Sequence, residues 1–145
     1  MLGPKDRRVK VALLLACIAM GCFWRAYPKQ VMTHADLLVA MARKGTDLVT
    51  AGAFTAETMP ELTYPLERAS MFVRGAEARV GSSRPASLAA LGDLCERYRA
   101  LVDVLDRVRR TERGDAARAV LAAPLAAVEQ GGALVHAALA AERGG

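Results

Sequence analysis

Residues 86–114 read ASLAALGDLCERYRALVDVLDRVRRTERG, and their apolar side chains recur every three or four positions. This spacing places them on one face of an α-helix. On the other face, three aspartates each stand four residues before an arginine, the favourable order for ion pairs along a helix. The pattern predicts a long amphipathic helix that ends at Gly114. Its apolar positions are Leu88, Leu91, Cys95, Tyr98, Leu101, Val102, Leu105 and Val108, and its acid–base pairs are Asp93–Arg97, Asp103–Arg107 and Asp106–Arg110.

Two segments before this helix show the same spacing. The first begins with Thr33 as a predicted N-cap and stops at Gly52, with Gly45 allowing a neighbouring helix to approach closely. The second begins at Pro65, since proline is tolerated in the first turn of a helix, and stops at the glycine of GSSRP, residues 81–85. The segments RAYPKQVM and AFTAETMP, which precede these two helices, are predicted to be loops.

The last segment begins at Asp115 and continues to the end of the chain. Pro124 is expected to kink or split this helix, and Gly131 and Gly132 to weaken it locally. No segment shows the alternation of a strand, and only 5% of the residues are aromatic. The sequence therefore predicts an all-α fold, an antiparallel up-and-down four-helix bundle over residues 33–145. The bundle follows a signal peptide or membrane anchor at residues 1–21 and a linker at residues 22–32.

The N-terminal segment has a basic leader, MLGPKDRRVK, and then an apolar run from Val11 to Trp24. A membrane span needs about 20 apolar residues, whereas the apolar core of a secretion signal has roughly 7–15. The run contains 14 residues, which favours a signal. The alternative is an uncleaved anchor, with Trp24 and Tyr27 at the membrane interface and the basic leader in the cytoplasm.

Ala19-Met20-Gly21-Cys22 resembles the lipobox of bacterial lipoproteins, whose usual form is Leu-Ala/Ser-Gly/Ala-Cys. The resemblance implies that the signal is cut before Cys22 and that Cys22 is the lipid attachment site. Ala19 and Met20 depart from the usual residues. Leu14-Leu15-Ala16-Cys17 matches the letters better but leaves a very short apolar core before it. Either a lipid or an uncleaved anchor places the protein at the membrane of a bacterial cell envelope, facing the periplasm or the exterior.

The net charge of +5 does not indicate a nucleic-acid partner. Residues 1–21 hold four basic residues and one acidic residue, so the remaining chain has a net charge of only +2. It lacks a basic face with aromatic stacking groups. Four arginines gather near the end of the 86–114 helix. They are expected to interact with the helix dipole, and the alternative is contact with anionic lipid or an acidic partner. These residues are Arg107, Arg109, Arg110 and Arg113.

The two histidines, His34 and His136, are predicted to lie at one end of the bundle, near Met32 and Met41. This arrangement resembles small periplasmic four-helix cytochromes of the b type, which implies haem or metal binding by His34, His136 and Met41. The alternative is that both are surface histidines without a cofactor. The sequence favours this second interpretation, because His34 falls at a helix start and His136 lies about 120° from its apolar stripe.

No constellation of catalytic residues is evident, and Cys95 lies in an apolar pattern typical of a buried thiol. We therefore expect a protein without enzymatic activity or a cofactor. The predicted function is scaffolding or protein interaction by a lipid-anchored bundle, through a protein partner or self-association. The alternative is a periplasmic bundle that binds haem, metal or a hydrophobic small molecule.

Overall fold

A computed structural model describes residues 3–145, and no strand occurs among them. They divide into two compact units, residues 3–30 and residues 31–145. The all-α architecture of four packed helices is confirmed. The helices are α1 (Pro4–Thr50), α2 (Met59–Val80), α3 (Ala86–Val108) and α4 (Gly114–Arg143), with a short 3₁₀ turn, η1 (Ala56–Thr58), before α2.

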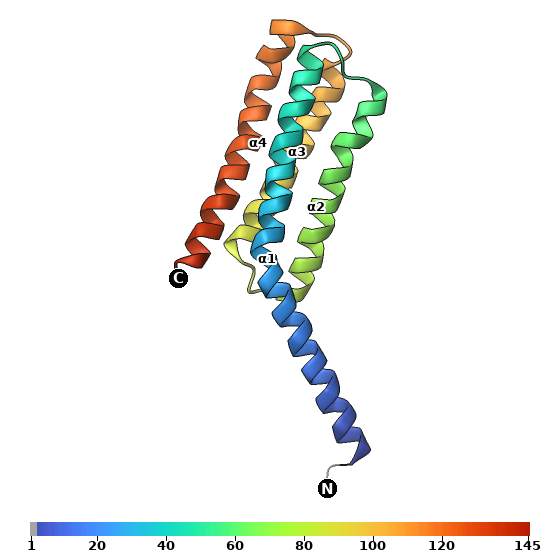
Figure 1. The fold of residues 1–145 in the computed structure, drawn as a ribbon. Coiled ribbons are helices and arrows are strands. Elements are labelled where there is room, and N and C mark those ends of the chain that lie inside the picture. The colour runs from blue at the N-terminus through green and yellow to red at the C-terminus, as the bar shows by residue number, and fades with distance from the viewer. Residues whose placement is uncertain (1–2) are drawn as a thin grey trace. The chain divides into compact units, whose positions relative to one another are not determined.

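Within residues 31–145, consecutive helices run antiparallel, and α4 packs beside both α1 and α3 (Figure 1). Gly45 of α1 allows the close approach predicted for it. A Cβ atom at Gly45 would lie 3.0 Å from side-chain atoms of both Leu62 of α2 and Leu105 of α3. On the opposite side of α1, Val39 reaches the backbone of Gly132 in α4. These contacts tie α1 to all three other helices.

The core of this unit is aliphatic and centred on α3. Leu91, Leu101 and Leu105 of α3 have no exposed surface, and Tyr98 is the largest fully buried side chain. The Tyr98 hydroxyl donates a 2.7 Å hydrogen bond to the carbonyl oxygen of Leu62. This bond satisfies a buried hydroxyl and fixes α2 against α3. The other helices contribute Val31, Ala35, Leu38, Ala42 and Val49 from α1, Leu62, Leu66, Ala69 and Val73 from α2, and Leu121, Val128, Val135 and Leu139 from α4.

The predicted start of the first helix at Thr33 is wrong, because residues 25–32 are helical and not a loop. Pro28 is the only helix-breaking residue in that stretch, and it lies inside α1. A proline removes one backbone hydrogen bond. Its neighbours here, including alanine, lysine, arginine and glutamine, are good helix formers. Thr33 is thus an interior residue of α1 and not a cap.

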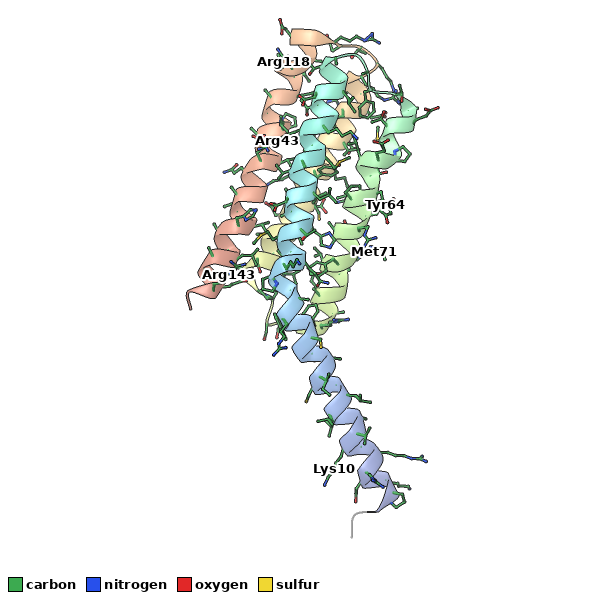
Figure 2. The ribbon with its side chains drawn as sticks, in the orientation of Figure 1. Lys10, Arg43, Tyr64, Met71, Arg118 and Arg143 are labelled. Atoms are coloured by element: carbon green, nitrogen blue, oxygen red, sulfur yellow. The ribbon has the colours of Figure 1, made fainter. Side chains whose placement is uncertain are left out.

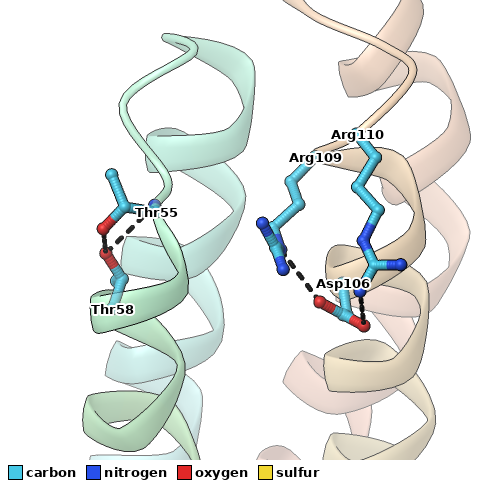
Figure 3. Close-up of polar contacts among 5 residues, drawn as sticks. All are labelled: Thr55, Thr58, Asp106, Arg109 and Arg110. Carbon is cyan, nitrogen blue, oxygen red and sulfur yellow. Dashed lines mark hydrogen bonds and ion pairs between the residues drawn. The ribbon is translucent and has the colours of Figure 1, made fainter.

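The second helix also begins earlier than predicted, at Met59 and not at Pro65. Pro60 occupies its first turn, the position that Pro65 was expected to hold, and Pro65 is buried inside α2. Before α2, η1 is held by the hydroxyl of Thr58, which accepts a 3.3 Å hydrogen bond from the Thr55 amide and lies 3.2 Å from the Thr55 hydroxyl (Figure 3).

The last two helices differ from the prediction at the end of α3 and at Pro124 inside α4. Helix α3 ends at Val108, and Gly114, with a φ of 58°, begins α4 where it was expected to end α3. Pro124 does not split α4, which runs uninterrupted to Arg143. Gly131 and Gly132 are both buried and allow close packing. Side-chain atoms of Leu94 on one side and Val39 on the other occupy the space that their Cβ atoms would need.

One carboxylate joins the start of α3 to the end of α4. Glu142 accepts a 2.8 Å hydrogen bond from the backbone amide of Ser87 and a 2.7 Å bond from its hydroxyl. Ser87 has no exposed surface. The first amide groups of a helix lack partners within the helix, so Glu142 serves as a cap for α3 supplied by another helix.

Candidate functional site

The first candidate site is the apolar surface of residues 9–24 in α1. An 18-residue stretch of α1 has a mean hydropathy of 1.8, and none of it is buried. Its large apolar side chains are between 42% and 63% exposed. The length and composition suit a membrane-crossing helix or a signal sequence. These side chains are Val9, Val11, Leu13, Leu14, Leu15, Ile18, Met20 and Trp24.

Aromatic rings gather where this apolar run ends. The ring of Trp24 lies 5.3 Å from that of Phe23 and 5.4 Å from that of Tyr27, between ring centroids. Tryptophan and tyrosine are typical of the membrane–water interface. Cys17 and Cys22 are both exposed on α1, so exposure alone does not distinguish them as lipid attachment sites.

The two histidines contact different helices. The ring of His34 lies 5.0 Å from that of Phe72 in α2. Burial lowers the pKa of His34, and the nearby charge of Arg68 lowers it further. The exposed His136 turns instead to α1, where its Nε2 lies 2.7 Å from Oδ1 of Asp36.

The structure thus gives each histidine its own neighbour, Phe72 for His34 and Asp36 for His136. Met41, the third residue proposed for haem or metal, is half-buried in α1. Within residues 3–145, no group of three or more histidine, cysteine, aspartate or glutamate residues could hold a metal ion. Asp36, the partner of His136, was not identified from the sequence, because the contact depends on the register of α1 against α4.

The second candidate site is the solvent face of α4. Helix α4 also contains a stretch apolar enough to cross a membrane, with a mean hydropathy of 1.2, and only 28% of that stretch is buried. Val120 and Leu134 are 46% and 45% exposed. The remaining exposed residues between 119 and 141 are all alanines, apart from Gln130 and His136. The ends of this face lie near Arg118 and Arg143 (Figure 2). Exposed apolar surface of this extent is typical of interaction sites.

Two of the four arginines near the end of α3, Arg109 and Arg110, make local ion pairs. Asp106 pairs with both Arg109, at 2.9 Å, and Arg110, at 3.0 Å (Figure 3). The hydrogen bond from Arg109 holds the pKa of Asp106 below its usual value. Arg109 also lies over the ring of Phe54, at 5.7 Å from its centroid. These pairs agree better with a structural role than with a recognition patch.

The third candidate site is a groove between α2 and α3. It consists of two hollows, of about 210 and 470 Å³, which share Ser70, Arg74 and Arg99 as lining residues. Cys95, predicted to be a buried thiol, is buried at the smaller hollow. Burial raises the pKa of the Cys95 thiol, and a hydrogen bond between this thiol and the Ser70 hydroxyl partly opposes the rise. The sequence did not indicate this groove, because its lining residues are scattered along two helices.

A comparison of the chain with protein-family models, curated proteins and solved structures found no match.

Proposed function

We propose that this protein is a lipid-anchored helical bundle of a bacterial cell envelope, with a scaffolding or protein-interaction role and no enzymatic activity. The observation that carries the proposal is the exposed apolar surface of residues 9–24. Exposing so many large apolar side chains to water is unfavourable, and insertion into a lipid layer removes that cost. Until the signal is cut before Cys22, the four basic residues of the leader stay on the cytoplasmic side.

Cys22 is the proposed lipid attachment site. It is exposed and follows Gly21, the small residue that the lipobox resemblance requires. Several acyl chains would hold the protein stably, because each buried methylene contributes about 0.8 kcal/mol. The aromatic rings of Phe23, Trp24 and Tyr27 would then lie next to the membrane surface.

The intact mass of the protein extracted from its native membranes tests this proposal. We expect the mass of residues 22–145 plus acyl chains for the natural protein and for the Cys17→Ser variant. The Cys22→Ser variant is expected to keep its full length and carry no acyl chain. A full-length mass for the natural protein would refute lipidation at Cys22 and make residues 11–24 a retained anchor.

The interaction role is supported by the solvent face of α4, which is mostly alanine and whose one acidic side chain, Glu129, is paired with Arg43. A flat surface of alanine, with Val120 and Leu134 exposed, can be covered by a partner without burying an unpaired charge. The partner is a protein or a second copy of this chain.

Site-specific photo-crosslinking in native membranes tests the surface. A crosslinker at Ala126 of α4 is expected to give one discrete product, whereas the same group at Ala100 is not. Ala100 is a matched control, because it is an exposed alanine on the charged face of α3. Equal crosslinking at the two positions would exclude α4 as the interaction surface.

A further inference from the structure

The groove between α2 and α3 holds two arginines with unused hydrogen-bond donors. Arg74 lines both hollows and makes no hydrogen bond or ion pair with any part of the chain that the structure describes. Arg99 also lines both, and its Nη1 donates to Oε1 of Glu96 at 2.5 Å. A guanidinium has five N–H donors, so Arg99 retains donors for another acceptor. Two cations facing one hollow repel each other, and an anion between them would relieve that repulsion.

A third donor lies buried in the same place. The Ser70 hydroxyl is shielded from solvent, and its polar neighbour is the Cys95 thiol, which is only a weak hydrogen-bond partner. Ser70 lines both hollows, as the two arginines do. The hydroxyl therefore lacks a strong partner, which is unfavourable for a buried polar group. A ligand oxygen could reach this hydroxyl only if the side chains around it shifted, so the two arginines are the donors that the groove presents directly.

The rest of the groove is apolar on one side. Leu66 and Met71 line the larger hollow and Val73 lines the smaller one. Met71 is 65% exposed and projects from α2, as does Tyr64 (Figure 2). The larger hollow falls within the range of roughly 300–1,000 Å³ that is typical of small-molecule sites.

Two acidic residues also face the groove, and they restrict where an anion can bind. Glu96 lines the smaller hollow, but its carboxylate is neutralised by Arg99. Glu67 lines only the larger hollow. An anionic group is therefore best placed in the smaller hollow between the arginines, and an apolar group in the larger one.

We propose that the α2–α3 groove binds an amphiphile with an oxyanion head, a carboxylate or a phosphate, and an apolar tail. The head accepts hydrogen bonds from Arg74 and Arg99. The tail lies along Leu66 and Met71. This proposal concerns residues 31–145 and holds whether or not Cys22 carries a lipid.

Nuclear magnetic resonance of the methionine methyl groups tests the proposal in the full chain, held in zwitterionic nanodiscs. The probes are octanoate and octyl phosphate, and their comparison identifies the preferred head. We expect the Met71 resonance, assigned with the Met71→Leu variant, to shift saturably with at least one probe. Octanol lacks the anionic head, and inorganic phosphate lacks the apolar tail. Each should bind at least tenfold more weakly than the preferred probe.

Variants distinguish the groove from binding elsewhere. Arg74→Gln is expected to weaken binding of the preferred probe at least tenfold, because it removes the cation without an internal partner. Arg118→Gln is the control, since Arg118 is an exposed arginine of α4 paired with Asp115. The proposal would be overturned if the Met71 resonance shifted with neither octanoate nor octyl phosphate. Binding of octanol as tight as that of octanoate, or an unchanged affinity in Arg74→Gln, would also overturn it.

Discussion

Helices α3 and α4 bury similar apolar stripes but differ in the kind of side chain that they present to solvent. Both place leucines and valines in the core, among them Leu101 in α3 and Leu121 in α4. The exposed positions of α3 include Asp93, Glu96, Arg99, Asp103 and Arg107, whereas those of α4 from 119 to 141 are mostly alanine. The one acidic side chain there, the part-exposed Glu129, is paired with Arg43. The buried stripe determines how each helix packs, and the solvent face determines what else it can contact. The two helices therefore have the same structural role and different capacities for interaction.

The largest expected effect comes from comparing a charge placed in the buried stripe of α3 with a charge placed on the solvent face of α4. Leu101→Asp puts a carboxylate into the centre of the core and is expected to cost more than about 4 kcal/mol, enough to abolish cooperative folding. Ala126→Asp, on the exposed face of α4, is expected to change stability by no more than about 1 kcal/mol. Thermal unfolding followed by circular dichroism measures both. A similar loss in the two variants would show that the solvent face of α4 is packed.

A smaller effect is expected at the glycines of α4. Gly132→Ala places a Cβ atom 2.6 Å from Cγ2 of Val39, so either the Val39 side chain or the two helices must shift. We expect a loss of about 1–3 kcal/mol in chemical denaturation. Adding Val39→Ala should recover part of the loss.

Gly75→Ala in α2 serves as the matched control for Gly132→Ala. No atom lies within 4 Å of the Cβ position at Gly75. Alanine there is expected to stabilise the helix by about 0.5–1 kcal/mol. A stabilised Gly132→Ala variant would contradict the close packing of α1 against α4.

The smallest expected effect tests the link between the two helices. Glu142→Ala removes the cap from Ser87 and should lower the free energy of unfolding by about 1–2 kcal/mol. Arg143→Ala, one residue further on, should change it by less than about 0.5 kcal/mol. Equal effects in chemical denaturation would mean that α3 does not depend on this cap.

The sequence predicted which helices form more accurately than it predicted where each helix begins and ends. The stripe of α3 was clear because large side chains recur at helical spacing. Two of the three predicted ion pairs, Asp93–Arg97 and Asp106–Arg110, also form. The start of α1 was missed because Thr33 has the residue type of a cap, although nothing before it stops the helix. Local residue preference cannot decide such a case, since favourable neighbours outweigh the single bond lost at Pro28.

The candidate sites were less predictable than the fold. Exposed apolar residues at 9–24 follow directly from composition. By contrast, the groove residues Ser70, Arg74 and Arg99 come together only through the register of α2 against α3. The same holds for His136 and Asp36, which are 100 residues apart. Helical periodicity identifies the face of one helix, but it does not fix which residue of the next helix lies opposite.

The cap on α3 has a consequence for the order of folding during synthesis. Glu142 lies 55 residues after Ser87. At about 5–20 residues per second, the ribosome needs roughly 3–11 s to synthesise the intervening chain. During that interval the start of α3 lacks its cap, and its core partners on α4 are still incomplete. The nascent chain therefore remains without its final packing for seconds, until the end of α4 has been made.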